Sequence, residues 1–282
     1  MSGDRKFELL STGHTLLEAP LWSEEHGLLF ADMVAGGVRS FRRDGLLKDI
    51  WPHRKGVGGI CLHENGALIV TGKNVAMRSF EGRELRETTT ILLEANNPRE
   101  RFNDLTVDKQ GRIYVGTYDA ELSSPGAIYL IDLDGSSRIV ATGTMLSNGL
   151  ALSPDGARLY QADTLRGAIL AYDVGEDGWL AAAQTFTSLD GERPDGATID
   201  RDGNLLVAVC GRGRISVYSA HGAEIDRIIV PDRDVTSLTF GGDDLSDLYV
   251  VTGSPDKPGA GCLYRSVNAG VGKEQNRFRM AR

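Results

Sequence analysis

Apolar and polar residues alternate with a period of two in short runs along most of the chain, and turn residues separate these runs. The segment "NGLALSPDGARLYQADT" at 148–164 shows the arrangement: an alternating run, a turn that contains Asp-Gly, and a second apolar run. This order is typical of a β-hairpin. No segment keeps the period of an amphipathic helix. The pattern therefore predicts an all-β protein.

The same hairpin unit recurs along the chain. It begins at residues 18, 58, 103, 148, 195 and 236, so the repeat has a period of 40–47 residues. Most units continue into a third short strand, as in "AIYLIDL" and "RISVYSA". Repeats of β-type and of this length form propeller blades. We therefore expect a six-bladed β-propeller with a central channel, in one domain that spans residues 1–282.

The two ends of the chain lie outside the repeat. The segment "KFELLS" (6–11) precedes the first unit and is expected to pair with the last blade, which would close the ring. Deletion of residues 1–11 without a loss of thermal stability would refute that hypothesis. The segment "GKEQNRFRMAR" (272–282) has no apolar face and predicts a frayed or disordered tail.

Composition narrows the class of partner. The formal net charge is −8, and the 31 basic side chains are scattered, whereas a nucleic-acid partner requires a basic stripe. No apolar run approaches the roughly 18 residues of a membrane span, and the N-terminus lacks the apolar core of a signal peptide. These features predict a cytoplasmic protein with no membrane or nucleic-acid partner, and they do not indicate an oligomeric state. The 3 cysteines form no CxxC pair, which argues against a zinc–thiolate site.

The first position of each repeat unit carries the candidate chemistry. In chain order it holds Glu18, Gly58, Asn103, Asn148, Asp195 and Thr236. Equivalent positions in a propeller are related by rotation about its axis, so two carboxylates and two amides should converge at one end of the channel. Such oxygen donors suit a hard divalent cation. Taken singly, an Asn or Asp before Gly is also a common turn residue, and that alternative remains open for each position.

Several motifs in one order extend this interpretation. They are "LLEAPLW" (16–22), "RFNDLTVDKQGRIYVGT" (101–117), "SNGLALSPDGARLYQADT" (147–164), "RPDGATIDRDGNLLVAV" (193–209) and "FGGDDLSDLYVVT" (240–252). Together they resemble the senescence marker protein, gluconolactonase and luciferin-regenerating enzyme family, over nearly the whole chain. The resemblance implies a six-bladed propeller with one divalent metal ion at the end of its channel.

The resemblance also assigns roles to individual residues. It implies that Glu18, Asn148 and Asp195 hold the metal ion. It further implies that Arg101, Asn103 and Glu121 contact the substrate, with Asp119 as a competitor for the role of Glu121. The segment "YDAELSSPGAIY" (118–129) departs from the Met-containing version common in the family and is shorter.

The function implied by the resemblance is metal-dependent hydrolysis of a lactone, foremost a sugar lactone of the gluconolactonase type. Asp195 is the candidate base and Glu18 the second choice. Ca²⁺ is the first expectation for the cation, with Zn²⁺, Mn²⁺ and Mg²⁺ as alternatives.

Two other functions remain open on the same fold. One is hydrolysis of a non-sugar lactone or ester, because the expected pocket lining of Trp22, Tyr118, Leu122 and Met145 is less polar than a polyol favours. The other is a non-catalytic, metal-binding regulatory propeller. A panel of lactones assayed with added metal separates the two classes.

Overall fold

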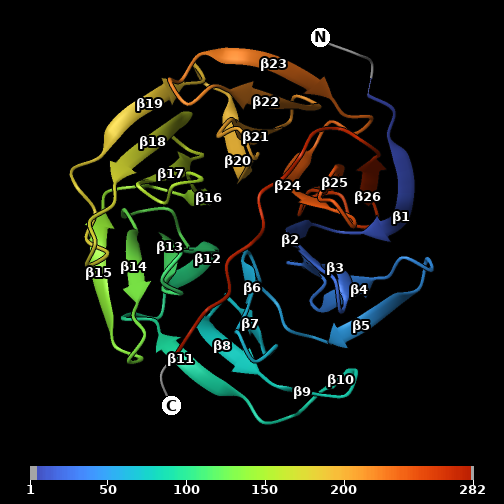
Figure 1. Cartoon of the computed structure of the whole chain (residues 1–282), viewed down its shortest axis with the longest axis horizontal. Coiled ribbons are helices and arrows are strands. Elements are labelled where there is room, and N and C mark those ends of the chain that lie inside the picture. Colours follow the sequence, from blue (N-terminus) through green and yellow to red (C-terminus); the bar gives the residue numbers. More distant parts are fainter. Residues whose placement is uncertain (1–4, 281–282) are drawn as a thin grey trace.

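The computed structural model describes residues 5–280, and every regular element in that range is a β-strand. Six four-stranded antiparallel sheets follow one another around a central channel, so the fold is a six-bladed β-propeller (Figure 1). The fold class predicted from the repeat is confirmed. The described range contains no helix long and apolar enough to span a membrane.

The first three blades follow the chain in order, with the innermost strand first. Blade 1 contains β2 (Leu17–Ser23), β3 (Gly27–Asp32), β4 (Val38–Phe41) and β5 (Leu47–Trp51). Blade 2 contains β6 (Ile60–Leu62), β7 (Leu68–Val70), β8 (Asn74–Arg78) and β11 (Thr90–Glu94). A small hairpin of β9 (Phe80–Glu81) and β10 (Glu84–Leu85) interrupts blade 2. Blade 3 contains β12 (Glu100–Val107), β13 (Ile113–Asp119), β14 (Ala127–Ile131) and β15 (Ser137–Thr142).

The remaining blades keep this order except at the last strand. Blade 4 contains β16 (Ser147–Leu152), β17 (Arg158–Asp163), β18 (Ala168–Asp173) and β19 (Gln184–Ser188). Blade 5 contains β20 (Arg193–Ile199), β21 (Leu205–Cys210), β22 (Arg214–Tyr218) and β23 (Glu224–Ile229). Blade 6 contains β24 (Val235–Gly241), β25 (Asp247–Thr252) and β26 (Gly261–Ser266), and its outer strand is β1 (Glu8–His14).

The ring is closed by the N-terminal strand. β1 pairs antiparallel with β26, and Leu9 lies opposite Tyr264 in that register. The last blade is therefore built from both ends of the repeat, as the sequence predicts. This arrangement covers the outer edge of β26 with hydrogen bonds that would otherwise be unmade.

Apolar side chains from neighbouring blades form the core. Leu29 and Val38 of blade 1 pack in one cluster with Ile60 and Leu68 of blade 2, and Leu29, Val38 and Leu68 are fully buried. Similar clusters lie between the other blades. Full burial of each such side chain contributes about 1.5–3 kcal/mol, so the contacts between blades hold the ring together.

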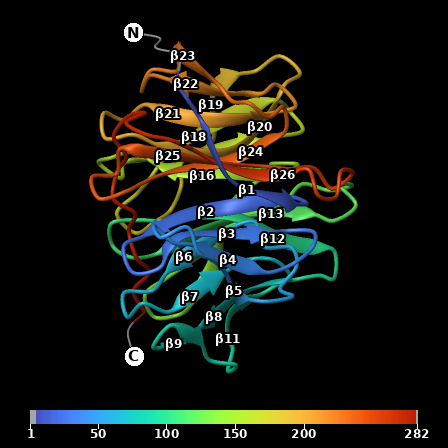
Figure 2. The same ribbon diagram turned by 90° about the vertical axis from the view of Figure 1, so that its right-hand side faces the viewer.

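The C-terminal segment is ordered through residue 280, which corrects the prediction of a frayed tail. We call residues 272–280 the strap: they cross the mouth of the channel from blade 6 towards blades 2 and 3, along one end of the ring (Figures 1 and 2). Phe278 is fully buried, its backbone N–H donates to Leu62 O at 2.9 Å, and its carbonyl accepts from Glu64 N at 2.8 Å. One buried aromatic ring and these backbone bonds replace the apolar face that the segment lacks. Residues 281–282 lie outside the described range.

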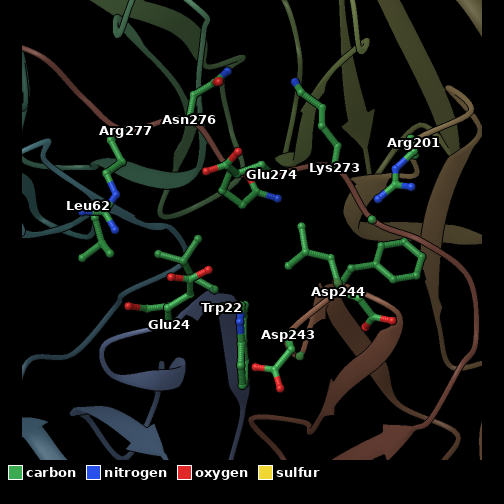
Figure 3. Close-up of a pocket in the computed structure, with 17 residues that line it drawn as sticks. Trp22, Glu24, Leu62, Arg201, Asp243, Asp244, Lys273, Glu274, Asn276 and Arg277 are labelled. Carbon is green, nitrogen blue, oxygen red and sulfur yellow. The ribbon is translucent and has the colours of Figure 1, made fainter.

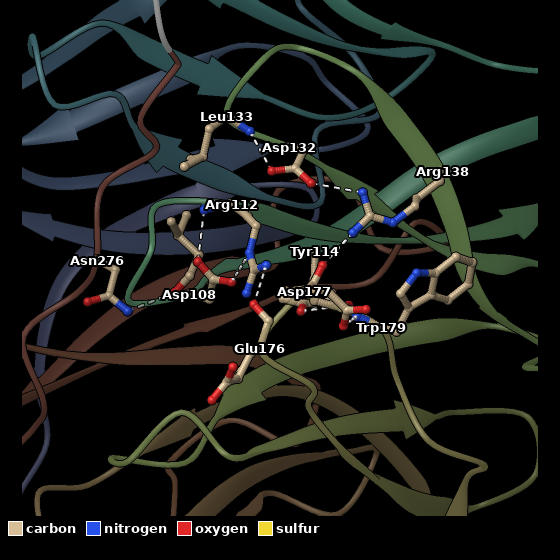
Figure 4. Close-up of polar contacts among 12 residues, drawn as sticks. Asp108, Arg112, Tyr114, Asp132, Leu133, Arg138, Glu176, Asp177, Trp179 and Asn276 are labelled. Atoms are coloured by element: carbon tan, nitrogen blue, oxygen red, sulfur yellow. Dashed lines mark hydrogen bonds and ion pairs between the residues drawn. The ribbon is translucent and has the colours of Figure 1, made fainter.

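A buried polar network joins blades 3 and 4 near the strap (Figure 4). Arg112 and Asp108 form an ion pair at 2.6 Å with both side chains almost fully buried. Arg112 also donates to Glu176 O at 3.0 Å, and Tyr114 Oη donates to Gly178 O at 2.9 Å. We call this end of the channel the strap end, and the opposite end, where the innermost strands begin, the entry end.

Candidate functional site

The innermost strands are irregular at the entry end. Their pairing register breaks between Glu18 and Leu21, Phe102 and Leu105, Asn148 and Leu150, Pro194 and Ala197, and Val235 and Ser237. Such β-bulges leave a residue unpaired, bend the strand and redirect a side chain. In blade 1 the bulge includes Ala19, whose φ of 54° lies in the left-handed region. The same local break therefore recurs in five blades, at the position that the repeat singles out.

The two amides lie against each other. Asn103 Nδ2 donates to Ser147 O at 2.7 Å and to the side-chain oxygen of Asn148. Asn148 Nδ2 in turn donates to Thr164 Oγ1 at 2.8 Å. Both amide nitrogens are therefore used within the protein, and the side-chain oxygens are the groups left to act as ligands. The oxygen of Asn148 already accepts one bond and keeps a second lone pair.

The two carboxylates are buried in the same region. Glu18 is 9% exposed and Asp195 is 8% exposed. Burial raises the pKa of Glu18 well above its usual value, and the nearby charges of Asp195 and Asp104 raise it further. Burial also raises the pKa of Asp195 to about 7, although Arg193 opposes that rise. Asp195 Oδ1 is buried and has no hydrogen-bond partner within residues 5–280.

Asp104 is a third acid, half-buried in the same region, which the repeat analysis missed. Burial raises its pKa to about 7, although backbone N–H groups of Leu150 and Leu105 donate to its carboxylate at 2.9 and 2.8 Å. The bond to Leu150 crosses from blade 3 to blade 4 and holds β16 beside the break that positions Asn148. Asp104 also lines a cavity of about 70 Å³ in the channel, which Lys273 of the strap lines too. Asp104 lies inside the bulge between Phe102 and Leu105, where two successive side chains can face the axis, and the repeat pattern alone carried no signal for it.

Glycines make room for this cluster. A Cβ at Gly58 would lie 2.0 Å from Asn103 Oδ1, which explains why the second repeat unit begins with glycine. A Cβ at Gly149 would lie 2.4 Å from Asp195 O, and Gly149 has a φ of 30°. The backbone at Gly149 therefore runs close to that of Asp195 on the neighbouring blade.

The arrangement fits a divalent cation held by oxygen atoms. Within residues 5–280, no group of three or more His, Cys, Asp or Glu side chains is arranged to hold a metal ion. A cation at the entry end would therefore depend on amide oxygens in addition to Glu18 and Asp195. The pKa values of Glu18 and Asp195 are raised, and Asp195 Oδ1 has no hydrogen-bond partner within residues 5–280. The negative charges of these two carboxylates are therefore not fully balanced by the protein, and a bound cation would balance them.

The candidate substrate contacts are divided between the site and the rim. Arg101 is half-buried and lies opposite Tyr118 in the register of β12 and β13. Glu121 is exposed and pairs with Arg99 at 3.0 Å. Asp119 is buried, and its carboxylate accepts from Ser124 Oγ and Glu121 N, both at 2.8 Å. Asp119 thus shapes the loop, which leaves Glu121 as the more available carboxylate.

Trp22 does not belong to the site, contrary to the expected pocket lining. It lies at the far end of β2, stacks on Tyr249 with ring centroids 5.4 Å apart, and lines a cavity of about 560 Å³ at the strap end (Figure 3). The strand β2 carries Glu18 at one end of the channel and Trp22 at the other. The short distance between them in the sequence therefore does not place Trp22 in the pocket beside Glu18. None of the clustered carboxylates and amides lines this cavity.

Known proteins share this fold and are similar to this chain in sequence. Residues 16–254 match the family described as the SMP-30/Gluconolactonase/LRE-like region. The chain belongs to this family. The match includes the repeat starts from Glu18 to Thr236.

Individual relatives cover almost the full length of this family member. The 6-deoxy-6-sulfogluconolactonase of Pseudomonas putida is 34% identical over 268 residues, which cover 88% of this chain and 89% of the relative. The pentonolactonase of Haloferax volcanii is 28% identical over 285 residues, covering 95% and 96%. Among solved structures, a luciferin-regenerating enzyme superposes with a TM-score of 0.89 at 23% identity, covers 98% of this chain and 100% of its own, and supports the fold.

Proposed function

We propose that this protein is a divalent-metal-dependent lactonase acting foremost on sugar lactones. The observation that carries the proposal is the pair of buried carboxylates, Glu18 and Asp195, beside the amides of Asn103 and Asn148 at the entry end. The names of the relatives from Pseudomonas putida and Haloferax volcanii support the class of reaction.

Glu18, Asn148 and Asp195 would hold the cation, and Asn103 lies beside it. A bound divalent cation would polarise the ester carbonyl and lower the pKa of a nearby water. We propose Ca²⁺ first, because the donors are all oxygen atoms; Mg²⁺, Mn²⁺ and Zn²⁺ are the alternatives.

The protein's own groups would move the proton and orient the substrate. In the reaction the oxygen of water bonds to the carbonyl carbon, the ring C–O bond breaks, and the ring oxygen takes up a proton. Asp195 is the proposed base that accepts the proton of water, with Glu18 as the second choice. Arg101 would donate a hydrogen bond to the oxygen that gains negative charge. Asn103, whose amide nitrogen already donates to Ser147 O and to the side-chain oxygen of Asn148, would orient the substrate by accepting from a hydroxyl group. Glu121 is the proposed rim contact to substrate hydroxyl groups.

The test is a panel of sugar and non-sugar lactones, read by acid release with a pH indicator. Protein loaded with a divalent cation should hydrolyse sugar lactones. It should lose this activity after chelation and recover it on addition of Ca²⁺, Mn²⁺, Mg²⁺ or Zn²⁺. Asn148→Ala should lower the rate at least tenfold, whereas Asn65→Ala, at an exposed strap-end turn, should not. Full activity after thorough chelation would refute the role of metal. Metal binding without turnover of any lactone or ester would favour a regulatory propeller.

A further inference from the structure

Two of the innermost strands carry an arginine at equivalent places. Arg101 lies two residues before Asn103 in blade 3, and Arg193 lies two residues before Asp195 in blade 5. In both strands the arginine belongs to the second-last residue pair before the bulge, opposite Tyr118 in one case and opposite Cys210 in the other. The rotation that relates the blades therefore places both at the entry end, on either side of β16 (Figure 1).

Neither arginine has an acidic partner among the residues that the structure describes. Arg101 Nη1 donates to the carbonyl oxygens of Pro98 and Glu100, both at 2.8 Å, and takes part in no ion pair within residues 5–280. Arg193 is exposed and makes neither a side-chain hydrogen bond nor an ion pair in that range. By contrast, the equivalent residue of blade 6, Asp234, pairs with Lys257 at 2.6 Å.

Neighbouring arginines of blade 5 are neutralised. Arg212 pairs with Glu192 at 3.1 Å, and Arg214 pairs with the same carboxylate. The remaining equivalent positions of the repeat are the uncharged residues Leu16, Gly56 and Leu146. Of the six equivalent positions of the repeat, therefore, only those of blades 3 and 5 carry a positive charge.

Each arginine lies two residues along its strand from a member of the carboxylate and amide cluster, Arg101 from Asn103 and Arg193 from Asp195. Burial raises the pKa of Tyr118. The positive charge of Arg101 opposes that rise and the negative charge of Glu18 adds to it, so both charges act on the Tyr118 hydroxyl. Arg193 likewise opposes the rise in the pKa of Asp195 that burial causes. A divalent cation would balance the charges of Glu18 and Asp195, and the carboxylate of Asp104 accepts from the backbone N–H groups of Leu105 and Leu150. None of these three acids would then serve as the ion-pair partner of Arg101 or Arg193.

We infer that Arg101 and Arg193 bind a second, anionic group of the substrate, so that the preferred lactones carry a carboxylate, sulfonate or phosphate remote from the ester. The inference rests on the proposed lactonase function and specifies its substrate class. Planar guanidinium groups form paired hydrogen bonds with such anions, and these bonds are stronger than those to neutral hydroxyl groups. A neutral polyol lactone would leave both charges without a counter-charge. Arg193 thereby becomes a specificity-determining residue.

The experiment compares lactones that share a ring and differ in one terminal group. The first pair is the γ-lactones of D-gluconic acid and D-glucaric acid, which end in a hydroxymethyl group and a carboxylate. The second pair is glucono-δ-lactone and its terminal phosphate ester. The metal-loaded wild type should show a kcat/KM at least tenfold higher for the anionic member of a hydrolysed pair, and this preference should weaken with added salt.

Substitution then separates charge recognition from catalysis. Arg193→Gln should lower the ratio of anionic to neutral kcat/KM by about tenfold or more, since charge-assisted bonds of this kind contribute about 1.5–3 kcal/mol. Arg212→Gln, which removes a neighbouring guanidinium already paired with Glu192, should leave the ratio unchanged. Arg193→Lys should restore part of the preference.

Each outcome has a distinct meaning. Equal use of anionic and neutral lactones by the wild type, or an equal loss for both in Arg193→Gln, would overturn the anionic-substrate inference and leave the lactonase function standing. Equal losses would instead indicate that the arginine stabilises charge in the reaction. Failure to hydrolyse any lactone would overturn the proposed function and this inference with it.

Discussion

Replacement of Asp195 by asparagine should stabilise the metal-free protein while abolishing its response to metal. Asp195 is buried, and its pKa in the folded protein is about 7, against 3.8 as the ordinary value. Since the folded pKa is raised, the folded state holds its proton more tightly than the unfolded state does. The metal-free protein should therefore lose stability as the pH rises from about 4 to about 7, and remain destabilised above that window.

The size of the effect follows from the shift. A difference of about 3 pKa units corresponds to roughly 4 kcal/mol at pH 8. For a domain of this size, that free energy corresponds to about 7 °C in Tm. Asparagine keeps the shape of the side chain and cannot ionise, so Asp195→Asn should melt several degrees above the wild type at pH 8 without metal. The two proteins should melt alike at pH 4.

The measurement is differential scanning calorimetry with a chelator from pH 4 to pH 8, repeated with Ca²⁺. Calcium should raise the Tm of the wild type at pH 8 and have little effect on Asp195→Asn, which should also lack lactonase activity. Asp155→Asn, an exposed turn carboxylate of blade 4, serves as the control and should change stability by less than about 1 kcal/mol. A metal-free Asp195→Asn protein that melts at or below the wild type at pH 8 would refute the reasoning.

Three further substitutions test other parts of the structure. Gly58→Ala should displace Asn103 and lower kcat/KM at least tenfold, because the new Cβ would lie 2.0 Å from Asn103 Oδ1; a crystal structure with Asn103 unmoved would contradict this. Arg112→Leu should cost about 3–5 kcal/mol in urea unfolding, since it leaves Asp108 buried and unpaired, whereas Arg138→Leu, in a more exposed pair, should cost far less. Phe278→Ala should cost about 3–5 kcal/mol, yet kcat/KM at low temperature should stay near the wild-type value, because the strap lies at the end opposite the site.

The repeat was sufficient to predict the ring and the place of the cluster. Each hairpin unit carries its own alternation and turn residues, so local pattern and tertiary fold agree, and rotation about one axis then brings Glu18 and Asp195 together. The roles assigned to these residues remain predictions. Asp104 could not be found by the same means, since the bulge that turns it inwards arises from pairing with the neighbouring strand.

The strap was mispredicted for a related reason. Its anchor, Phe278, is a single aromatic residue in a polar stretch, and a single residue produces no periodicity. Its burial depends on a pocket that blades 2 and 3 form together. Trp22 lies outside the predicted site because a channel-lining strand has one end at each mouth of the channel. Glu18 and Trp22 lie near opposite ends of β2.

Closure of blade 6 by β1 also has a consequence for synthesis on the ribosome. The outer strand of this blade, β1, is made before the other strands of the ring, and its partner β26 is made after them. Until β26 has left the ribosome, β1 has no edge to join, and Glu18 and Asp195 belong to an arc that is still open. The nascent protein would therefore complete the proposed cation site only after β26 has emerged, and a chain truncated before residue 261 would lack a closed ring.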